Sequence, residues 1–132
     1  MMTHISSTVL YVGNQGVSLA FFRDTLGFEV VKDLEMGPGS RWLEVRPPGA
    51  QTSIVLSDAA AFGRTPGEGA ELTFIADDVA ATVKELRARG ATVSDPTVEP
   101  WTTFATVEAP DGKRVLFKEA KDSPEARGIW EA

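Results

Sequence analysis

The sequence contains no cysteine and only one histidine among its 132 residues. Without cysteine the chain can form neither a disulfide nor a thiolate nucleophile, and it cannot supply thiolate ligands to a zinc ion. This absence fits a cytoplasmic protein. No apolar run approaches the roughly 20 residues that a membrane-spanning helix requires, so we expect no membrane partner. The first residues lack a basic segment followed by an apolar one, and a secretory signal peptide is therefore not predicted.

Basic residues are also in deficit. The 13 lysines and arginines face 19 aspartates and glutamates, which gives a formal net charge of −6. The basic residues are scattered rather than clustered, which argues against binding nucleic acid, because that requires many cations to displace counterions. A hydrophobic content of 42% with 24% charged residues is ordinary for a globular domain. We therefore expect a single domain whose charge lies on a solvated surface.

The two halves of the chain repeat one order of elements: a strand, a helix and three further strands. Each helical pattern ends near a glycine, Gly27 or Gly90, as a left-handed C-terminal cap requires. In the first half, the predicted strand, helix and three strands lie at residues 8–12, 17–26, 28–33, 41–45 and 52–57. In the second half, they lie at residues 72–76, 79–89, 91–96, 103–109 and 113–119.

The repeat predicts a domain organisation. One domain spans residues 1–132, with module 1 at about 3–57, a linker at 58–68, module 2 at about 69–120 and a C-terminal tail at 121–132. In the tail, Ile129 and Trp130 follow Pro124. This apolar pair predicts docking, either on its own domain or across a dimer interface, and a disordered tail is the alternative.

Four stretches carry a resemblance to a known family: VLYVGNQGVSLAFFRDTLGFEVV, RWLEVRPPG, FIADDVAATVKELRARGATV and EAPDGKRVLF. Their order and duplication resemble the vicinal oxygen chelate superfamily, which includes glyoxalase I, bleomycin-resistance proteins and extradiol dioxygenases. The resemblance implies an α+β fold, in which two βαβββ modules form a curved, half-open mixed β-sheet barrel with flanking helices around a pocket. It also implies a homodimer, with the modules paired either within one chain or across the dimer.

Strand parity separates the faces of the predicted sheets, because successive side chains point to opposite sides. Apolar residues such as Leu10 and Leu43 should meet the helices, which leaves the alternate residues facing the pocket. The ligand-binding residues predicted in this way are Tyr11, Trp42, Glu44, Val55, Glu71, Thr73, Phe104, Arg114 and Leu116, with Trp101 at the rim. Alternatively, Trp42 and Phe104 simply fill the cup.

The superfamily's metal site takes one ligand from each of four strands. The resemblance places these positions at Ser7, Val55, Glu71 and Leu116. Valine and leucine have no donor atom and a serine hydroxyl is a poor ligand, so only Glu71 could bind a metal well. The single histidine, His4, is expected at the surface. We therefore predict a protein without a metal or another cofactor.

Two functions of different classes remain open. The first is a protein of the bleomycin-resistance type that sequesters a small aromatic or heterocyclic molecule in a metal-free cup. The alternative is a metal-independent isomerase or lyase, with Glu71 as general base and Arg114 stabilising an enolate-like charge. The base role requires burial of Glu71, whereas pairing with Arg114 or Lys118 would keep it ionised. A third, non-catalytic possibility is an assembly partner for another protein.

Overall fold

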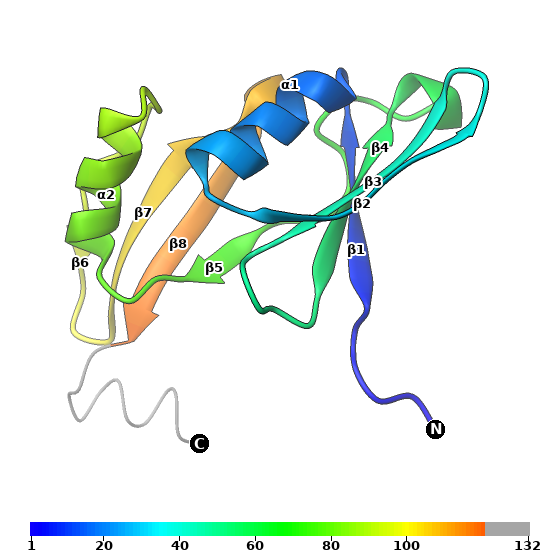
Figure 1. Ribbon diagram of the computed structural model, residues 1–132. Helices are drawn as coiled ribbons and strands as arrows, with labels where there is room; N and C mark the ends of the chain where they lie inside the picture. The colour runs from blue at the N-terminus through cyan, green and yellow to red at the C-terminus, as the bar shows by residue number, and fades with distance from the viewer. Residues whose placement is uncertain (121–132) are drawn as a thin grey trace. The chain divides into compact units, whose positions relative to one another are not determined.

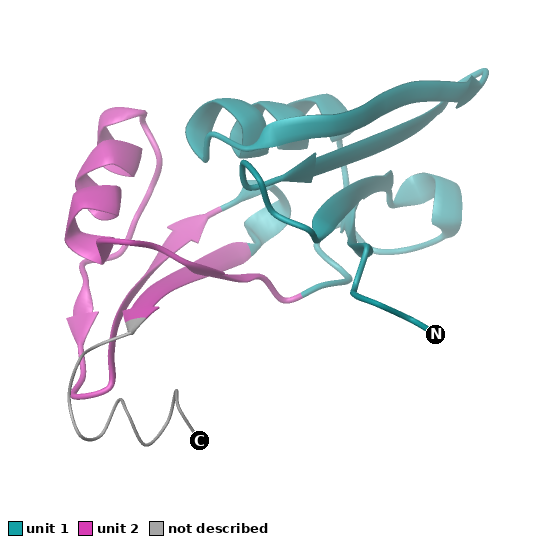
Figure 2. Ribbon diagram, turned by 60° about the horizontal axis from the view of Figure 1, so that its bottom comes forward, with its two compact units in different colours: residues 1–70, 109–113 teal, residues 71–108, 114–132 magenta. Residues whose placement is uncertain are grey.

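The computed structural model of the chain describes residues 1–120, so the predicted tail at 121–132, with Ile129 and Trp130, lies outside the described residues. The chain divides into two compact units (Figure 2). Unit 1 consists of Met1–Ala70 and Ala109–Lys113, and unit 2, among the described residues, of Glu71–Glu108 and residues 114–120. Each unit is built around one four-stranded sheet.

Unit 1 contains a mixed sheet in the order β1-β4-β3-β2 (Figure 1). Strand β1 runs parallel to β4, whereas the β4–β3 and β3–β2 pairs are antiparallel. The elements are β1 (Ser7–Val12), α1 (Gln15–Ala20), a π-helical turn η1 (Phe21–Thr25), β2 (Glu29–Gly37), β3 (Ser40–Arg46), β4 (Ser53–Asp58) and a 3-10 turn η2 (Ala60–Phe62). A second 3-10 turn, η3 (Pro110–Gly112), belongs to the same unit.

Local chemistry explains where the helix of unit 1 begins and which face it buries. The side-chain oxygen of Asn14 accepts a hydrogen bond from the amide of Val17 at 3.0 Å and so caps the first turn. Leu19 and Phe22 are buried, and the Phe22 ring contacts the ring of Phe28. The aliphatic core residues on one covered face of the sheet occupy alternate strand positions: Leu10, Val12, Leu43, Val45, Ile54 and Leu56. On β3 and β4 the intervening Glu44, Ser53 and Val55 are buried as well.

Unit 2 repeats the arrangement, with the sheet order β5-β8-β7-β6. Its elements are β5 (Thr73–Ile75), α2 (Val79–Ala88), β6 (Thr97–Val98), β7 (Thr102–Glu108) and β8 (Arg114–Ala120). The Asp78 carboxylate accepts a hydrogen bond from the amide of Ala81 and caps α2. One covered face again alternates along the strands, and its buried residues are Val79, Val83 and Leu86 of α2 and Ala105, Val107, Val115 and Phe117 of the sheet.

The predicted α+β class and the duplicated βαβββ order are confirmed, and the sheets are curved and open rather than closed barrels. The strand predicted at residues 91–96 is wrong, because this stretch makes only an isolated bridge between Val93 and Val107. Pro96 has no amide hydrogen to donate, and regular pairing starts beyond it, at β6. Strand β2 is longer than predicted and pairs with β3 as far as Gly37.

The predicted linker is more ordered than its glycines and prolines indicate. The amide of Gly67 donates to the carbonyl of Tyr11 at 2.8 Å, and the amide of Tyr11 donates to the carbonyl of Glu68 at 2.9 Å. The amide of Ala70 donates to Val9 in the same way. Residues 67–70 therefore cover the edge of β1 that would otherwise present unpaired backbone groups. Within residues 1–120, no helix is long and apolar enough to cross a membrane.

Candidate ligand-binding site

Four of the predicted ligand-binding residues share the open face of the sheet in unit 1, the face that carries the side chains alternating with the buried core. Tyr11 comes from β1, Trp42 and Glu44 come from β3, and Val55 comes from β4. The strand register places Val55 beside Val9 on one side and beside Glu44 on the other. Trp42 is 41% exposed, whereas Val55 is 3% exposed.

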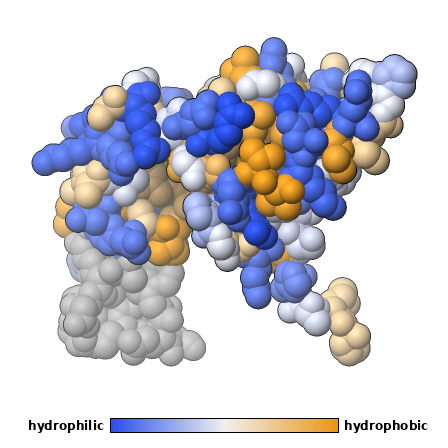
Figure 3. All heavy atoms as spheres, in the orientation of Figure 1, coloured by the Kyte–Doolittle hydropathy of each residue, from blue (hydrophilic) through white to orange (hydrophobic). Residues whose placement is uncertain are grey.

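A cavity of about 170 Å³ opens on this face. Trp42, Val55 and Ser57 contribute from the sheet, and Phe62 contributes from η2. The remaining lining residues are Met36, Gly39, Ser40, Arg41, Asp58 and Ala61. Apolar side chains also reach the surface among hydrophilic ones on the side of unit 1 seen in Figure 3. The cavity therefore combines one large aromatic ring from β3 with a second from η2.

The sequence analysis did not predict two apolar residues that line this cavity, Met36 and Phe62. Met36 lies beyond the predicted end of its strand, and Phe62 lies in a segment that we interpreted only as a linker. Phe62 remains 65% exposed, and its ring meets the ring of Tyr11 edge to face, with 6.2 Å between the centroids. The short apolar run Ala59–Phe62, directly before Gly63, is the signal that could have indicated an apolar contact here.

Tyr11 is partly covered by the segment that follows η2. The guanidinium carbon of Arg64 lies 4.5 Å from the centroid of the Tyr11 ring, a cation–π contact. Arg64 also pairs with Glu68, with 2.9 Å between Nε and Oε2. One face of the Tyr11 ring is thus occupied by the protein itself, which leaves Trp42 and Phe62 as the more accessible aromatic surfaces.

Glu44 is a buried carboxylate on the same face as Trp42, only 8% exposed. Its Oε1 accepts a hydrogen bond from Nε1–H of Trp42 at 2.8 Å, and its Oε2 accepts one from the Ser53 hydroxyl at 2.6 Å. Burial raises the pKa of Glu44, but the bonds from Ser53 and Trp42 and the charge of Lys32 outweigh it and hold the pKa below its ordinary value. The carboxylate is therefore ionised at neutral pH.

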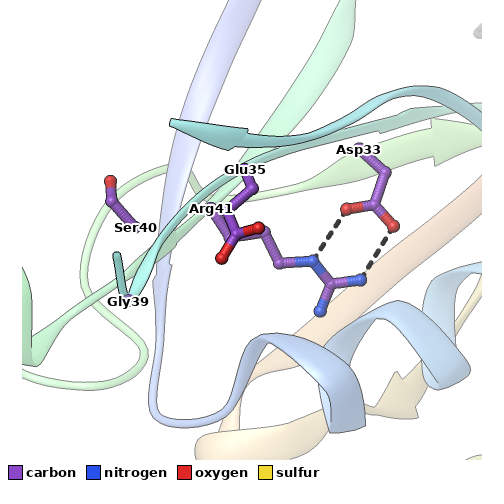
Figure 4. A pocket seen from close by; sticks show the side chains of 5 residues that line it. All are labelled: Asp33, Glu35, Gly39, Ser40 and Arg41. Carbon is purple, nitrogen blue, oxygen red and sulfur yellow. Dashed lines mark hydrogen bonds and ion pairs between the residues drawn. The ribbon is translucent and has the colours of Figure 1, made fainter. Parts of the chain in front are cut away.

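A second hollow, of about 360 Å³, lies at the β2–β3 hairpin (Figure 4). It is lined by Asp33, Glu35, Gly39, Ser40 and Arg41. Figure 4 shows the Arg41 guanidinium turned toward Asp33, with which it forms two hydrogen bonds of 2.8 Å. Bonding to Arg41 holds the pKa of Asp33 below its ordinary value. The strongest charges here neutralise each other, so this hollow offers less to a ligand than the aromatic cavity.

The other predicted site residues belong to unit 2. Thr73, Leu116 and Thr106 lie in register across β5, β8 and β7, and Phe104 lies opposite Lys118 on the same open face. Glu71 is exposed and precedes β5. Arg114 pairs with Glu108, with 3.1 Å between Nε and Oε1, and Trp101 lies half-exposed between β6 and β7. The structure thus gathers the predicted residues into two groups, one in each unit.

Comparison with known proteins identifies the class. The family model of the Glyoxalase/Bleomycin resistance protein/Dioxygenase superfamily matches residues 4–117, and the chain belongs to this superfamily. The Bacillus subtilis (strain 168) protein YetH is 30% identical over 120 residues, which cover 90% of this chain and all of that protein.

Solved structures agree with this assignment. TnmS3, an antibiotic binding protein from Streptomyces sp. CB03234, is 32% identical, with a TM-score of 0.80 over 91% of this chain and 98% of that chain. A superfamily member from Sphaerobacter thermophilus DSM 20745 is 33% identical, with a TM-score of 0.80 over 89% of this chain and 98% of that chain. Lactoylglutathione lyase from Agrobacterium tumefaciens is 25% identical, with a TM-score of 0.63 over 90% and 95% of the two chains.

The donor set does not fit the metal site that the superfamily implies. Of the four corresponding positions, Val55 and Leu116 carry no donor atom, and Ser7 carries only a hydroxyl. No group of three or more histidine, aspartate and glutamate side chains within the described part of the chain is arranged to hold a metal ion. The remaining carboxylate, Glu71, supplies one ligand where a catalytic metal needs at least three. These four positions therefore cannot form the metal centre of the superfamily.

Proposed function

We propose that this protein binds a small, planar aromatic or heterocyclic molecule without a metal, as proteins that sequester a drug do. The observation that carries this proposal is the cavity on the open face of unit 1, lined by Trp42, Val55, Met36 and Phe62. Two aromatic rings and two aliphatic side chains bury a flat apolar ring favourably. Ser57 and Asp58, at the same cavity, provide polar groups that orient a ligand.

The size of the cavity limits the ligand. Its volume of about 170 Å³ is below the roughly 300–1,000 Å³ of pockets that enclose drug-sized molecules. We therefore expect unit 1 to hold one or two fused rings, either as a whole small molecule or as the flat part of a larger one. The similarity to TnmS3, which is described as an antibiotic binding protein, supports this class of ligand.

A thermal-shift screen of aromatic metabolites and antibiotics tests the proposal, followed by calorimetry on the hits. Trp42→Ala removes the main stacking surface, and we expect the affinity for a hit to fall at least about tenfold, or ~1.4 kcal/mol. Val17→Ala is the matched control, because Val17 is an exposed apolar residue on α1 and does not line the cavity. An empty screen, or equal affinities of the two variants, would contradict aromatic binding in this cavity.

A second candidate function, a metal-independent isomerase or lyase, rests on the register in unit 2. Thr73 pairs with Leu116 in parallel strands, and the amide of Leu116 donates to the carbonyl of Leu72. Glu71 lies two residues before Thr73, and Arg114 lies two residues before Leu116, so both are near the start of this parallel pair. In this proposal Glu71 accepts a proton and Arg114 stabilises the resulting anion. Glu71 is exposed in the structure, so the burial that the base role requires has to come from the bound substrate. The test is to assay Glu71→Gln with any compound from the screen that the wild-type protein converts. Loss of turnover with binding retained supports the base role, and unchanged turnover eliminates it.

We also propose that the protein is a cytoplasmic homodimer. The exposed apolar residues of the open face, which include Leu34 and Met36, support an assembly that covers part of this face. Light scattering coupled to size-exclusion chromatography gives the mass directly. A mass of one chain at micromolar concentration would contradict the dimer.

A further inference from the structure

The indole of Trp42 is hydrogen-bonded to the carboxylate of Glu44, which is in turn hydrogen-bonded to Ser53. Trp42 and Glu44 lie two residues apart on β3, so their side chains leave the same face of the sheet. Nε1–H of Trp42 donates to Oε1 of Glu44 at 2.8 Å, and the Ser53 hydroxyl of the neighbouring strand donates to Oε2 at 2.6 Å. Each carboxylate oxygen thus accepts one of these hydrogen bonds, from Trp42 of β3 or from Ser53 of β4.

Packing alone does not require this arrangement. A buried carboxylate is costly, and an apolar side chain of similar size is often equally or more stable at such a position. Glu44 is buried on a face where Trp42, which it holds, stays 41% exposed. The charged side chain is therefore placed where it fixes the orientation of an accessible ring, since a half-exposed indole without a partner for its N–H would turn more freely about its side-chain bonds.

We propose that Glu44, supported by Ser53, is a positioning residue that fixes the Trp42 indole as the flat wall of the aromatic cavity. This inference rests on the proposed ligand-binding function and specifies how recognition works there. Because the indole N–H is already used, Trp42 offers a ligand its ring face and no hydrogen-bond donor. Trp42 therefore favours a ligand with a planar π surface that can stack on the indole. Hydrogen bonds to the ligand come from other cavity residues, such as Ser57 and Asp58.

The orientation can be measured without any ligand, from the indole N–H resonance of Trp42 in a 15N–1H spectrum, assigned with Trp42→Phe. Glu44→Leu removes the acceptor while keeping an apolar side chain in place. We expect the indole proton to shift upfield and to exchange with water about tenfold faster or more, as loss of a charge-assisted hydrogen bond implies. Ser53→Ala should move the resonance in the same direction by less, and it provides a reading if Glu44→Leu does not fold.

Two controls separate positioning from general structural damage. Glu44→Gln keeps an acceptor for the indole, and its amide can donate to Ser53, whose hydroxyl has the Ser6 carbonyl 3.3 Å away as an alternative acceptor. Because the neutral amide is a weaker acceptor than the carboxylate, the resonance of this variant should lie between those of Glu44→Leu and the wild type, nearer to the wild type. Glu35→Leu removes a carboxylate from the same hairpin, on the face opposite to Trp42, and should change nothing. A Glu44→Gln resonance displaced as far as that of Glu44→Leu would overturn the hydrogen-bond mechanism.

A titration with quinoline, a two-ring planar probe, connects the orientation to binding. We expect its affinity to fall roughly two- to tenfold in Glu44→Leu and to stay unchanged in Glu44→Gln and Glu35→Leu, since misaligned stacking loses part of the aromatic contact. An unmoved indole resonance in Glu44→Leu, or a moved resonance with unchanged quinoline affinity, overturns the inference. A wild-type protein that binds no aromatic compound refutes the proposed function instead, and the ligand-free resonance then decides the positioning role by itself.

Discussion

The contact between residues 67–70 and β1 makes Gly69→Ala a sharp test of how the segment after η2 is held. Gly69 has φ of 110° and forms an antiparallel bridge with Leu10. A Cβ added to Gly69 would lie 2.3 Å from the carbonyl oxygen of Val9, a backbone atom that cannot rotate away. The segment must therefore move away from β1, and this movement weakens the hydrogen bonds on both sides of the bridge.

The cost has three parts. A non-glycine residue at positive φ costs roughly 1–2 kcal/mol. The hydrogen bonds from Ala70 to Val9 and from Tyr11 to Glu68 contribute on the order of 0.5–1.5 kcal/mol each, and moving the segment weakens both. We expect the free energy of unfolding to fall by about 3 kcal/mol, which is a large share of the ~5–15 kcal/mol of a typical domain.

Gly63→Ala is the matched control. Gly63 also has positive φ, 64°, but a Cβ there would meet no atom within 4 Å. Its expected cost is therefore the backbone term alone, about 1 kcal/mol. Urea unfolding followed by circular dichroism measures both variants, and the midpoint of Gly69→Ala should lie about 1 M below that of Gly63→Ala for a slope near 2 kcal/mol/M. Equal midpoints would refute the close approach of Gly69 to β1.

Three further predictions follow from single contacts. Phe22→Ala should lower the free energy of unfolding by about 3–5 kcal/mol in urea titration, because this ring is 1% exposed, and Phe22→Leu should cost clearly less. Asp78→Ala should cost about 1 kcal/mol by losing the cap of α2, and Asp78→Asn, which keeps the acceptor, should restore most of it. The pKa of Glu44 is lower in the folded state than in the unfolded state. Ionised Glu44 therefore stabilises the fold above the unfolded-state pKa, near 4.3, and this contribution is lost as the pH falls through the lower folded-state pKa. Acid titration of unfolding should therefore be shallower in Glu44→Gln than in the wild type, and parallel curves would contradict this.

Much of the fold was predictable because its signals are local. The glycines Gly27 and Gly90 end their helical segments, and both have positive φ. Alternation along each strand depends only on the pleat, so Trp42 and Glu44 could be assigned to one face before any pairing was known. The prediction failed where pairing depends on a distant partner, as at residues 91–96, whose strand pairing with β7 is limited to the isolated bridge of Val93.

The candidate site was predictable only in part. Trp42 and Val55 were found by parity and line the cavity, but Phe62 was not, because its place against Tyr11 depends on the path of a glycine- and proline-rich segment. The pairing of that segment with β1 joins residues more than 50 positions apart. Neither periodicity nor turn propensity reports on such a contact.

The sequence by itself determined which chemistry the corresponding metal positions can support, because Val55 and Leu116 lack donor atoms in any conformation. It also determined the duplicated order of elements, since turns, caps and alternation are written into neighbouring residues. Only the tertiary structure decided that Glu44 holds Trp42 with help from Ser53, and that Phe62 closes the other side of the cavity. The physical reason is that strand register and loop path are set by contacts between residues far apart in the chain, which no local pattern encodes.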